Sequence, residues 1–255
     1  MFIDSHCHID FPELAENIDG VLAKMRENQV SQCLCISVNL EDFPRVLKLA
    51  EKHKNVFATV GVHPDYEDIE EPDVARLVQL AAHPKIIGIG ETGLDYYRLT
   101  GDLEWQRERF RTHIRAAIKT RKPLIIHTRS AAADTLKIMH AENAADIGGV
   151  MHCFTESWEM AEQAMDMNFY ISFSGIVTFK NAVQIKGVAM RVPLDRMLIE
   201  TDSPYLAPVP FRGKLNQPGY VKHVAEEIAR LRSVSVEEIA SHTTKNFNKL
   251  FNIIN

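Results

Sequence analysis

The chain alternates between short, continuously apolar runs and longer stretches in which apolar residues recur every three or four positions. Continuous apolar runs are typical of parallel strands buried on both faces, and the longer spacing is typical of amphipathic helices. Strands are therefore predicted over 2–4, 33–37, 56–60, 86–90, 124–126, 149–152, 170–173 and 197–200. Helices are predicted over 13–28, 41–53, 70–82, 103–120, 131–142, 156–166, 179–189, 218–231 and 236–252.

Eight strands, each followed by a helix and spaced about 30 residues apart, are typical of the α/β class and of a (β/α)8 TIM barrel in particular. An open, doubly wound sheet is the alternative. The sequence contains no linker and no internal repeat, so residues 1–255 are predicted to form a single barrel domain. Ser235, with Glu238 three residues later, predicts the start of the last helix as a capping box.

Ionisable residues stand at the ends of the predicted strands. The first strand ends Asp4-Ser-His6-Cys-His8, and residues two apart on a strand share a side, so His6 and His8 are expected to project together. Four later predicted strands also end in, or are directly followed by, ionisable residues: Glu91, His127, His152, and Glu200 with Asp202. A parallel barrel brings all its carboxyl ends to one face, where barrel enzymes place their catalytic groups. An open sheet would scatter them along an edge, so the pattern favours the barrel.

Four histidines and two carboxylates at one mouth predict a metal site. Such groups are costly to leave uncompensated in a partly desolvated pocket. Six ligands exceed the needs of one tetrahedral ion, so we expect two divalent ions bridged by a carboxylate, with Glu91 best placed to bridge. Histidine-rich ligation suits Zn, Mn, Co or Ni better than Mg. A hydrogen-bonded network without metal is the alternative.

Further residues are candidates for contact with substrate. His63 closes the third strand on the same face, where it could contact substrate or a further metal. Arg129 and Arg212 are the cations nearest the mouth, and an anionic substrate needs such residues. Asp95 and Arg98 are expected to anchor the loop after the fourth strand. The remaining histidines are expected at the surface or at helix caps: His53, His83, His113, His140, His223 and His242.

The composition narrows the classes of protein. The 255 residues carry a formal net charge of −5 and a sequence pI of about 6.1, which argues against a protein that coats nucleic acid. The four cysteines form no CxxC pair, so reduced thiols in a cytoplasmic protein are expected, with Cys7 and Cys153 pointing away from the ligand side. No apolar run approaches a membrane span of about 18 residues, the start has no secretory signal, and no obligate protein partner is evident.

Taken together, several segments resemble the TatD family of metal-dependent deoxyribonucleases, and the resemblance runs from the first strand to Thr244-Lys-Asn246-Phe. It rests on Asp4-Ser-His6-Cys-His8, Gly90-Glu91-Thr-Gly-Leu-Asp95-Tyr, Pro123-Leu-Ile-Ile-His127-Thr-Arg129, His152-Cys-Phe154 and Glu200-Thr-Asp202-Ser-Pro204-Tyr. The resemblance implies a barrel of the amidohydrolase type, a divalent-metal site and phosphodiester hydrolysis, often exonucleolytic on DNA. The ligands it implies for a first ion are His6, His8, Glu91 and Asp202, and for a second ion Glu91, His127 and His152.

Two departures from the family pattern concern the substrate side. The family often has HSRDA where this chain has His127-Thr-Arg-Ser130-Ala, and RGKxNEP where it has Arg212-Gly-Lys-Leu-Asn216-Gln217-Pro. Asp202 is the expected acceptor of the proton from the attacking water. Hydrolysis of an amide, cyclic amide or lactone is the first alternative activity, although the carboxylated lysine of several such enzymes is replaced here by Glu91. A catalytically silent metal-binding protein is the second.

Overall fold

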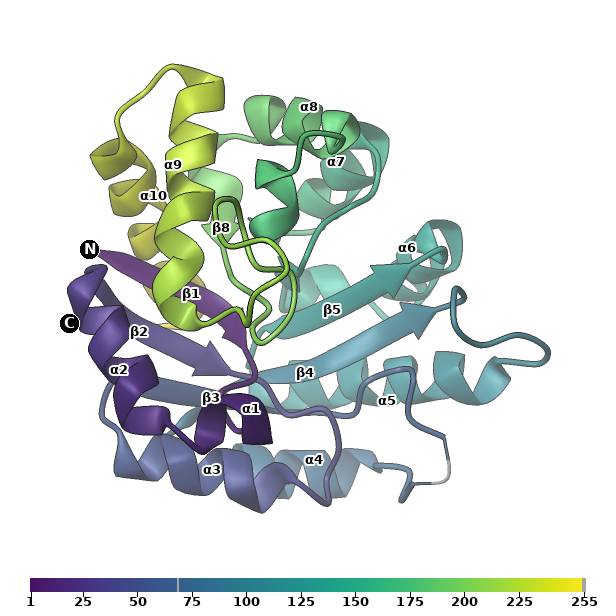
Figure 1. Ribbon diagram of the computed structural model, residues 1–255. Helices are drawn as coiled ribbons and strands as arrows, with labels where there is room; N and C mark the ends of the chain where they lie inside the picture. Colours follow the sequence, from purple (N-terminus) through teal and green to yellow (C-terminus); the bar gives the residue numbers. More distant parts are fainter. Residues whose placement is uncertain (68, 254–255) are drawn as a thin grey trace. The chain divides into compact units, whose positions relative to one another are not determined.

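The computed structural model describes residues 1–67 and 69–253 and shows the predicted alternation of strands and helices (Figure 1). Its strands are β1 (Phe2–Cys7), β2 (Val30–Cys35), β3 (Val56–Val60), β4 (Ile86–Asp95), β5 (Leu124–Arg129), β6 (Gly149–Met151), β7 (Phe169–Phe173) and β8 (Met197–Ile199). Its α-helices are α1 (Pro12–Ala15), α2 (Ile18–Glu27), α3 (Phe43–Lys52), α4 (Val74–Ala81), α5 (Glu104–Thr120), α6 (Ala132–Ala141), α7 (Trp158–Asp166), α8 (Val183–Arg191), α9 (Val221–Arg232) and α10 (Val236–Leu250). Short 3-10 helices are η1 (Ala144–Asp146), η2 (Gly175–Thr178), η3 (Leu194–Arg196) and η4 (Pro218–Tyr220).

The strands form one sheet in the order β1 to β8, and helices follow each strand, so the predicted (β/α)8 barrel class is confirmed. By its internal contacts the chain divides into two compact units. The first comprises Met1–Cys35, Cys153–Ala161 and Ile171–Asn255, and the second Ile36–His152 and Glu162–Tyr170. The interpretation of residues 1–255 as a single domain stays a prediction.

In the first unit, β1 pairs in parallel with β2, and the residues after β8 pair with the end of β1. The backbone N–H of Asp202 donates to the His6 carbonyl at 2.9 Å, and the N–H of His8 donates to the Ser203 carbonyl at 2.8 Å. Pairing between the first and the last strand is what closes a barrel. It also fixes the position of Asp202 beside the two histidines of β1.

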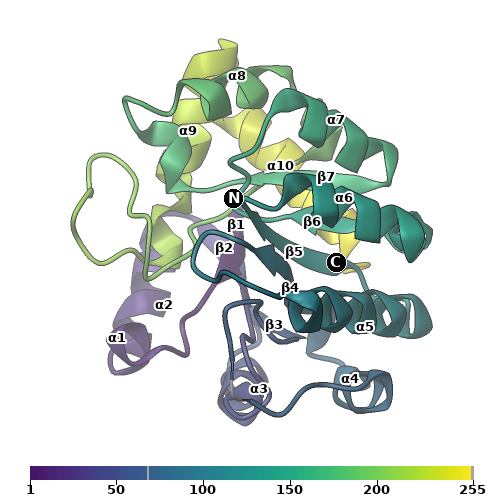
Figure 2. The same cartoon turned by 90° about the vertical axis from the view of Figure 1, so that its right-hand side faces the viewer.

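In the second unit, β4 and β5 are long parallel neighbours, with α5 packed along β4 (Figures 1 and 2). The register sets Gly93 opposite His127 and Asp95 opposite Arg129. Gly93 has a φ of 135°, and a Cβ at this position would clash with the His127 carbonyl oxygen. A residue without a side chain is therefore required for the two backbones to approach at this point.

Several element boundaries differ from those expected from the sequence, and two of the differences change the description of the fold. The helix expected over 13–28 is two helices, α1 and α2, because Asn17 between them has a non-helical backbone with φ −129° and ψ 46°. The strand expected to end at residue 90 continues to Asp95, so the five residues from Glu91 to Asp95 belong to β4 and not to a loop. The capping box is confirmed in its main bond, since the Ser235 side chain accepts from the backbone N–H of Glu238.

His113 was expected at the surface and is instead completely buried. It shares the buried face of α5 with Phe110, Ile114 and Ala117, at the spacing of one helix stripe. Its Nδ1 donates to the Arg109 carbonyl at 2.8 Å, and its Nε2 accepts from the backbone N–H of Val62 at 3.0 Å. Burial lowers the pKa of His113 to about 4, so the ring is neutral at pH 7.

The other five histidines of that set are partly or fully exposed, as expected: His53, His83, His140, His223 and His242. Within the described part of the chain, no helix is both long and apolar enough to cross a membrane.

Candidate metal-binding site

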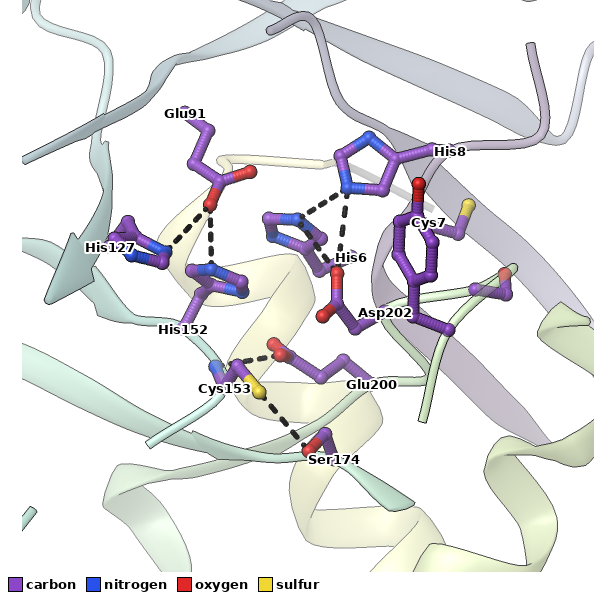
Figure 3. Close-up of polar contacts among 12 residues, drawn as sticks. His6, Cys7, His8, Glu91, His127, His152, Cys153, Ser174, Glu200 and Asp202 are labelled. Atoms are coloured by element: carbon purple, nitrogen blue, oxygen red, sulfur yellow. Dashed lines mark hydrogen bonds and ion pairs between the residues drawn. The ribbon is translucent and has the colours of Figure 1, made fainter. Parts of the chain in front are cut away.

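Three histidines of the second unit surround one carboxylate oxygen. Oε1 of Glu91 lies 2.8 Å from Nε2 of His152, 3.2 Å from Nδ1 of His127 and 3.3 Å from Nε2 of His63. Figure 3 shows His127 and His152 directed at Glu91 from two neighbouring strand ends. We call His63, Glu91, His127 and His152 the Glu91 group. Glu91 and His152 are buried, whereas His63 and His127 are partly exposed, so the group opens to solvent on the side of these two rings.

His127 has a second carboxylate partner. Its Nε2 lies 3.0 Å from Oδ2 of Asp95, while its Nδ1 faces Glu91. Burial raises the pKa of Asp95, but the hydrogen bonds from His127 and from the Tyr97 backbone N–H outweigh it and lower that pKa to about 2. Burial lowers the pKa of His127, and the two carboxylates outweigh that effect and raise it. A carboxylate on the outer nitrogen fixes the ring orientation of a metal-binding histidine.

The first unit holds a second group, made of His6, His8 and Asp202, which we call the Asp202 group. The two Nε2 atoms of His6 and His8 lie 3.3 Å apart, which confirms that the rings project together from β1. Oδ1 of Asp202 lies 3.6 Å from Nε2 of His6 and 3.4 Å from Nε2 of His8. Three potential ligand atoms thus form a nearly equilateral triangle (Figure 3).

Buried polar residues hold the Asp202 group in place. The Asp4 carboxylate accepts from the Thr201 backbone N–H at 2.8 Å and from its hydroxyl at 2.6 Å, and so ties β1 to the residue before Asp202. Burial raises the pKa of Asp4, and the Thr201 bonds oppose this. The side-chain amide of Asn216, which is fully buried, donates to the carbonyls of Thr201 and Tyr205 at 2.9 and 2.6 Å. Asp202 itself has a positive φ of 55°, and these bonds surround that turn.

A third polar cluster lies at the ends of β6, β7 and β8. The backbone N–H of Cys153 donates to Oε1 of Glu200 at 2.7 Å, and its Sγ lies 3.2 Å from Oγ of Ser174 (Figure 3). Glu200 is fully buried, so its carboxylate holds the backbone directly after His152. The Cys7 thiol, in turn, donates to the Leu34 carbonyl at 3.3 Å.

The donor atoms of both groups fit divalent metal ions. Bonds of about 2.0–2.1 Å to a tetrahedral ion place its ligand atoms roughly 3.3–3.4 Å apart. The separations in the Asp202 group are 3.3, 3.4 and 3.6 Å, and two of those around Glu91 are 3.2 and 3.3 Å. His63, Glu91 and His127 also offer ligand atoms that all lie within 4.8 Å of one another. Imidazole and carboxylate are the ligands that zinc and similar ions take.

The two arginines that were predicted to contact an anionic substrate each stack on an aromatic ring. The Arg129 guanidinium lies 3.8 Å from the centroid of the Tyr97 ring, and that of Arg212 lies 3.8 Å from the Phe179 ring. Arg129 is at the end of β5, two residues from His127. Arg212 is exposed in the loop between β8 and η4.

Sequence reasoning identified the histidines and carboxylates of both groups, and each group assembles within its own unit. The gathering of all six ligands at one mouth and the bridging role of Glu91 stay predictions. The contact of Asp95 with His127 was missed, because the strand was ended too early in the sequence. Extended by five residues, its alternation places Glu91 and Asp95 on one side of β4, on either side of Gly93. No local sequence pattern predicted that Asp4 would accept hydrogen bonds from Thr201, or that Glu200 would accept one from the backbone of Cys153.

A (β/α)8 sheet with histidine–carboxylate groups at its strand ends defines a metal-dependent hydrolase type of barrel protein. The family model described as TatD related DNase matches residues 3–252, so the chain belongs to this family. It is 48% identical over 254 residues to the protein of Escherichia coli K12 named uncharacterized metal-dependent hydrolase YcfH, covering 98% of this chain and 96% of that protein.

Two further comparisons agree. The chain is 42% identical over 254 residues to the uncharacterized metal-dependent hydrolase YabD of Bacillus subtilis 168, covering 99% of this chain and 100% of YabD. The crystal structure of the TatD homologue YjjV from Escherichia coli K12 superposes with a TM-score of 0.90 at 29% identity, covering 99% of this chain and 98% of YjjV. YcfH and YabD are thus both named metal-dependent hydrolases, and this chain shares its barrel architecture with the crystal structure of YjjV.

Proposed function

We propose that this protein hydrolyses phosphodiester bonds of DNA, releasing nucleotides from its ends, with one divalent ion held by the Glu91 group and one by the Asp202 group. The observation that carries the proposal is the spacing of the ligand atoms, 3.3 to 3.6 Å in the triangle of His6, His8 and Asp202. Membership in a family described as TatD related DNase supports the choice of reaction.

Bound divalent ions would polarise a phosphoryl oxygen and lower the pKa of a water molecule. The chain's own residues set which ions fit. The Glu91 group offers three imidazoles and one carboxylate, which favours Zn, Mn, Co or Ni over the oxygen-preferring Mg. Asp95 holds the His127 ring from behind, so that Nδ1 stays directed at Glu91.

Asp202 is the residue we assign as proton acceptor. Its side chain is 17% exposed, against 0% for His6 and 5% for His8, so it is the member of its group that water reaches. A carboxylate in this position can take the proton of the attacking water. Glu91, buried among three imidazoles, serves as ligand and holds these rings together.

The anionic substrate is supported by Arg129 and Arg212. Arg129 ends β5 and Arg212 lies in the loop between β8 and η4, and each guanidinium is held over an aromatic ring. A guanidinium can neutralise the charge that develops on phosphoryl oxygens. Within β4, Glu91 takes the place of the lysine that is carboxylated in several amide hydrolases. This glutamate also supports a phosphodiesterase over an amide hydrolase.

The test is a substrate screen of metal-reconstituted protein. Oligonucleotides with free or blocked 3′ and 5′ ends are compared with a panel of amides, cyclic amides and lactones, each with Zn, Mn, Co, Ni and Mg. The proposal expects release of nucleotides from free DNA ends and no more than slow turnover of the other panel. Turnover of a lactone or amide with no cleavage of any oligonucleotide would overturn it. No turnover with any metal would favour a silent metal-binding protein.

A further inference from the structure

Tyr97 is an aromatic residue that the fold holds out in solvent. Its relative exposure is 64%, among the largest of the apolar side chains that the structure describes. Burying an aromatic ring stabilises a protein by about 1.5–3 kcal/mol relative to exposure, so an ordered loop does not gain stability by leaving it uncovered. Tyrosine and tryptophan are enriched at recognition surfaces, because their rings offer a large contact area together with a polar group.

The backbone that carries this ring is fixed. The N–H of Tyr97 donates to Oδ1 of Asp95 at 2.8 Å, and the N–H of Tyr96 donates to the Arg129 carbonyl at 2.9 Å. The bond from Tyr96 to Arg129 continues the pairing of β4 with β5 beyond Asp95, and the bond from Tyr97 to Asp95 holds the next residue to the end of β4. The backbone of Tyr97 is therefore held at the end of β4 by Asp95 and by the neighbouring bond to β5.

Arg129 covers one face of the ring. Its guanidinium lies 3.8 Å from the ring centroid, the distance of a stacked cation–π pair. With this stack in place Tyr97 is still 64% exposed, so much of its side chain is accessible to a ligand. A planar, π-rich group of similar size would complete a three-layer arrangement with Tyr97 in the middle.

The backbone of Tyr97 is also connected to the Glu91 group. The Asp95 carboxylate accepts from Tyr97 with one oxygen and contacts Nε2 of His127 with the other. The buried Asp95 side chain thus links the backbone that carries the exposed ring to an imidazole that faces Glu91. A ligand that reaches both places needs an anionic or ester part for the Glu91 group and a flat ring for Tyr97.

We infer that Tyr97, stacked on Arg129, is a platform for a nucleobase of the substrate, adjacent to the bond that is cleaved. The inference rests on the proposed function and names the recognition element of the same site. Stacking on a π face is tolerant of sequence, because every base has one. The platform therefore makes the enzyme require a base at this position without requiring a particular base.

The test uses oligonucleotides with 2-aminopurine at one terminal position, at the 3′ or the 5′ end, and matched oligonucleotides with an abasic residue there. Binding to the metal-loaded protein is followed by competition and by 2-aminopurine quenching, and KM and kcat are measured for both substrates. Tyr97→Leu keeps an apolar side chain but removes the π face. Tyr97→Phe keeps the π face, and Tyr96→Phe is the neighbouring control, since the Tyr96 hydroxyl bonds Asp134 and its ring is half-buried.

We expect Tyr97→Leu to weaken binding of the base-containing oligonucleotide about 5- to 150-fold, to abolish quenching and to leave the abasic one unchanged. Tyr97→Phe is expected to restore the wild-type preference, and Tyr96→Phe to retain it. Equal losses on both oligonucleotides, or a wild-type protein without preference for the base, would overturn the platform. Cleavage of abasic DNA with no base preference would leave the proposed phosphodiesterase standing while removing the platform. Absence of any DNA cleavage, with quenching that still depends on Tyr97, would remove the phosphodiesterase alone.

Discussion

His127 and Asp95 are joined by a 3.0 Å hydrogen bond between Nε2 and Oδ2, while the other nitrogen of the same ring lies 3.2 Å from Glu91. One imidazole is thus held between two carboxylates from the same strand, β4. The arrangement separates two roles that a single mutation can distinguish, because Glu91 faces the proposed ion and Asp95 only orients the ring.

Asp95→Asn is therefore expected to weaken binding of the ion at the Glu91 group about 10- to 100-fold, the usual effect of removing the outer partner of a histidine ligand. Competition with a fluorescent chelator measures the affinity, and circular dichroism verifies the fold. Asp134→Asn is the matched control, because Asp134 accepts from Tyr96 in the same region and contacts no histidine of the group. Equal metal affinity in the two variants would show that Asp95 serves the loop only.

Asp202→Asn tests the proton acceptor. The amide keeps the shape and one possible oxygen ligand but loses charge and basicity, so kcat should fall about 10²–10⁴-fold while the ion at the Glu91 group stays bound. Metal stoichiometry and kcat are measured together across a metal titration. His140→Ala, at an exposed position of α6, should leave both unchanged. Recovery of the wild-type rate at excess metal would reduce Asp202 to a ligand.

Arg212→Ala tests the anionic substrate. Loss of this exposed cation should raise KM for DNA, make the rate less sensitive to salt and leave the hydrolysis of an uncharged ester unaffected. Initial rates at several salt concentrations, on both substrates, measure the effect. Equal losses on the two substrates would indicate that the stack of Arg212 on Phe179 is structural.

Gly93→Ala tests the close approach of β4 to β5. With φ 135° and the His127 carbonyl in the way, an added methyl group should destabilise the protein by at least about 2 kcal/mol. Gly187→Ala in α8 is the control and should change stability in the opposite direction. A Cβ there meets nothing within 4 Å, and alanine should stabilise the helix by about 0.5–1 kcal/mol. Urea unfolding at pH 7 measures both, and a neutral Gly93→Ala would contradict the register.

His113 predicts a pH dependence of stability. Its folded pKa of about 4 lies below the unfolded value of 6.5, so the folded state binds fewer protons than the unfolded chain between these pH values. The contribution is complete above pH 6.5 and is lost as the pH falls toward 4, with about 2 kcal/mol lost at pH 5. His113→Leu should be less stable at pH 7.5 but lose less on going to pH 5. Urea unfolding at both pH values measures the free energy of unfolding of each protein. An equal loss of stability between pH 7.5 and pH 5 in both proteins would refute the neutral, buried ring.

Much of the site was accessible from local patterns. The alternation of side chains along a strand placed His6 and His8 on one side of β1, and their Nε2 atoms are 3.3 Å apart. Glu91, His127 and His152 each follow an apolar run that predicted a buried parallel strand, and parallel pairing places these neighbouring strands side by side. Both inferences need only the period of a strand and the direction of its neighbours.

Other features depended on tertiary structure. The contact of Asp95 with His127 requires the register of β4 against β5 and a strand five residues longer than its apolar run. Burial of His113 requires the packing of α5, and the bond from Thr201 to Asp4 joins residues 197 positions apart in the sequence.

The sequence by itself determined the class of fold, the residue types that can bind metal and the strands on or after which they lie. These follow from hydrophobic period and strand direction, which are local properties of the chain. Only the tertiary structure decided which carboxylate holds which imidazole and which aromatic ring stays in solvent. Such pairings depend on hydrogen-bond register and on side chains far apart in sequence, and a local pattern carries no record of either.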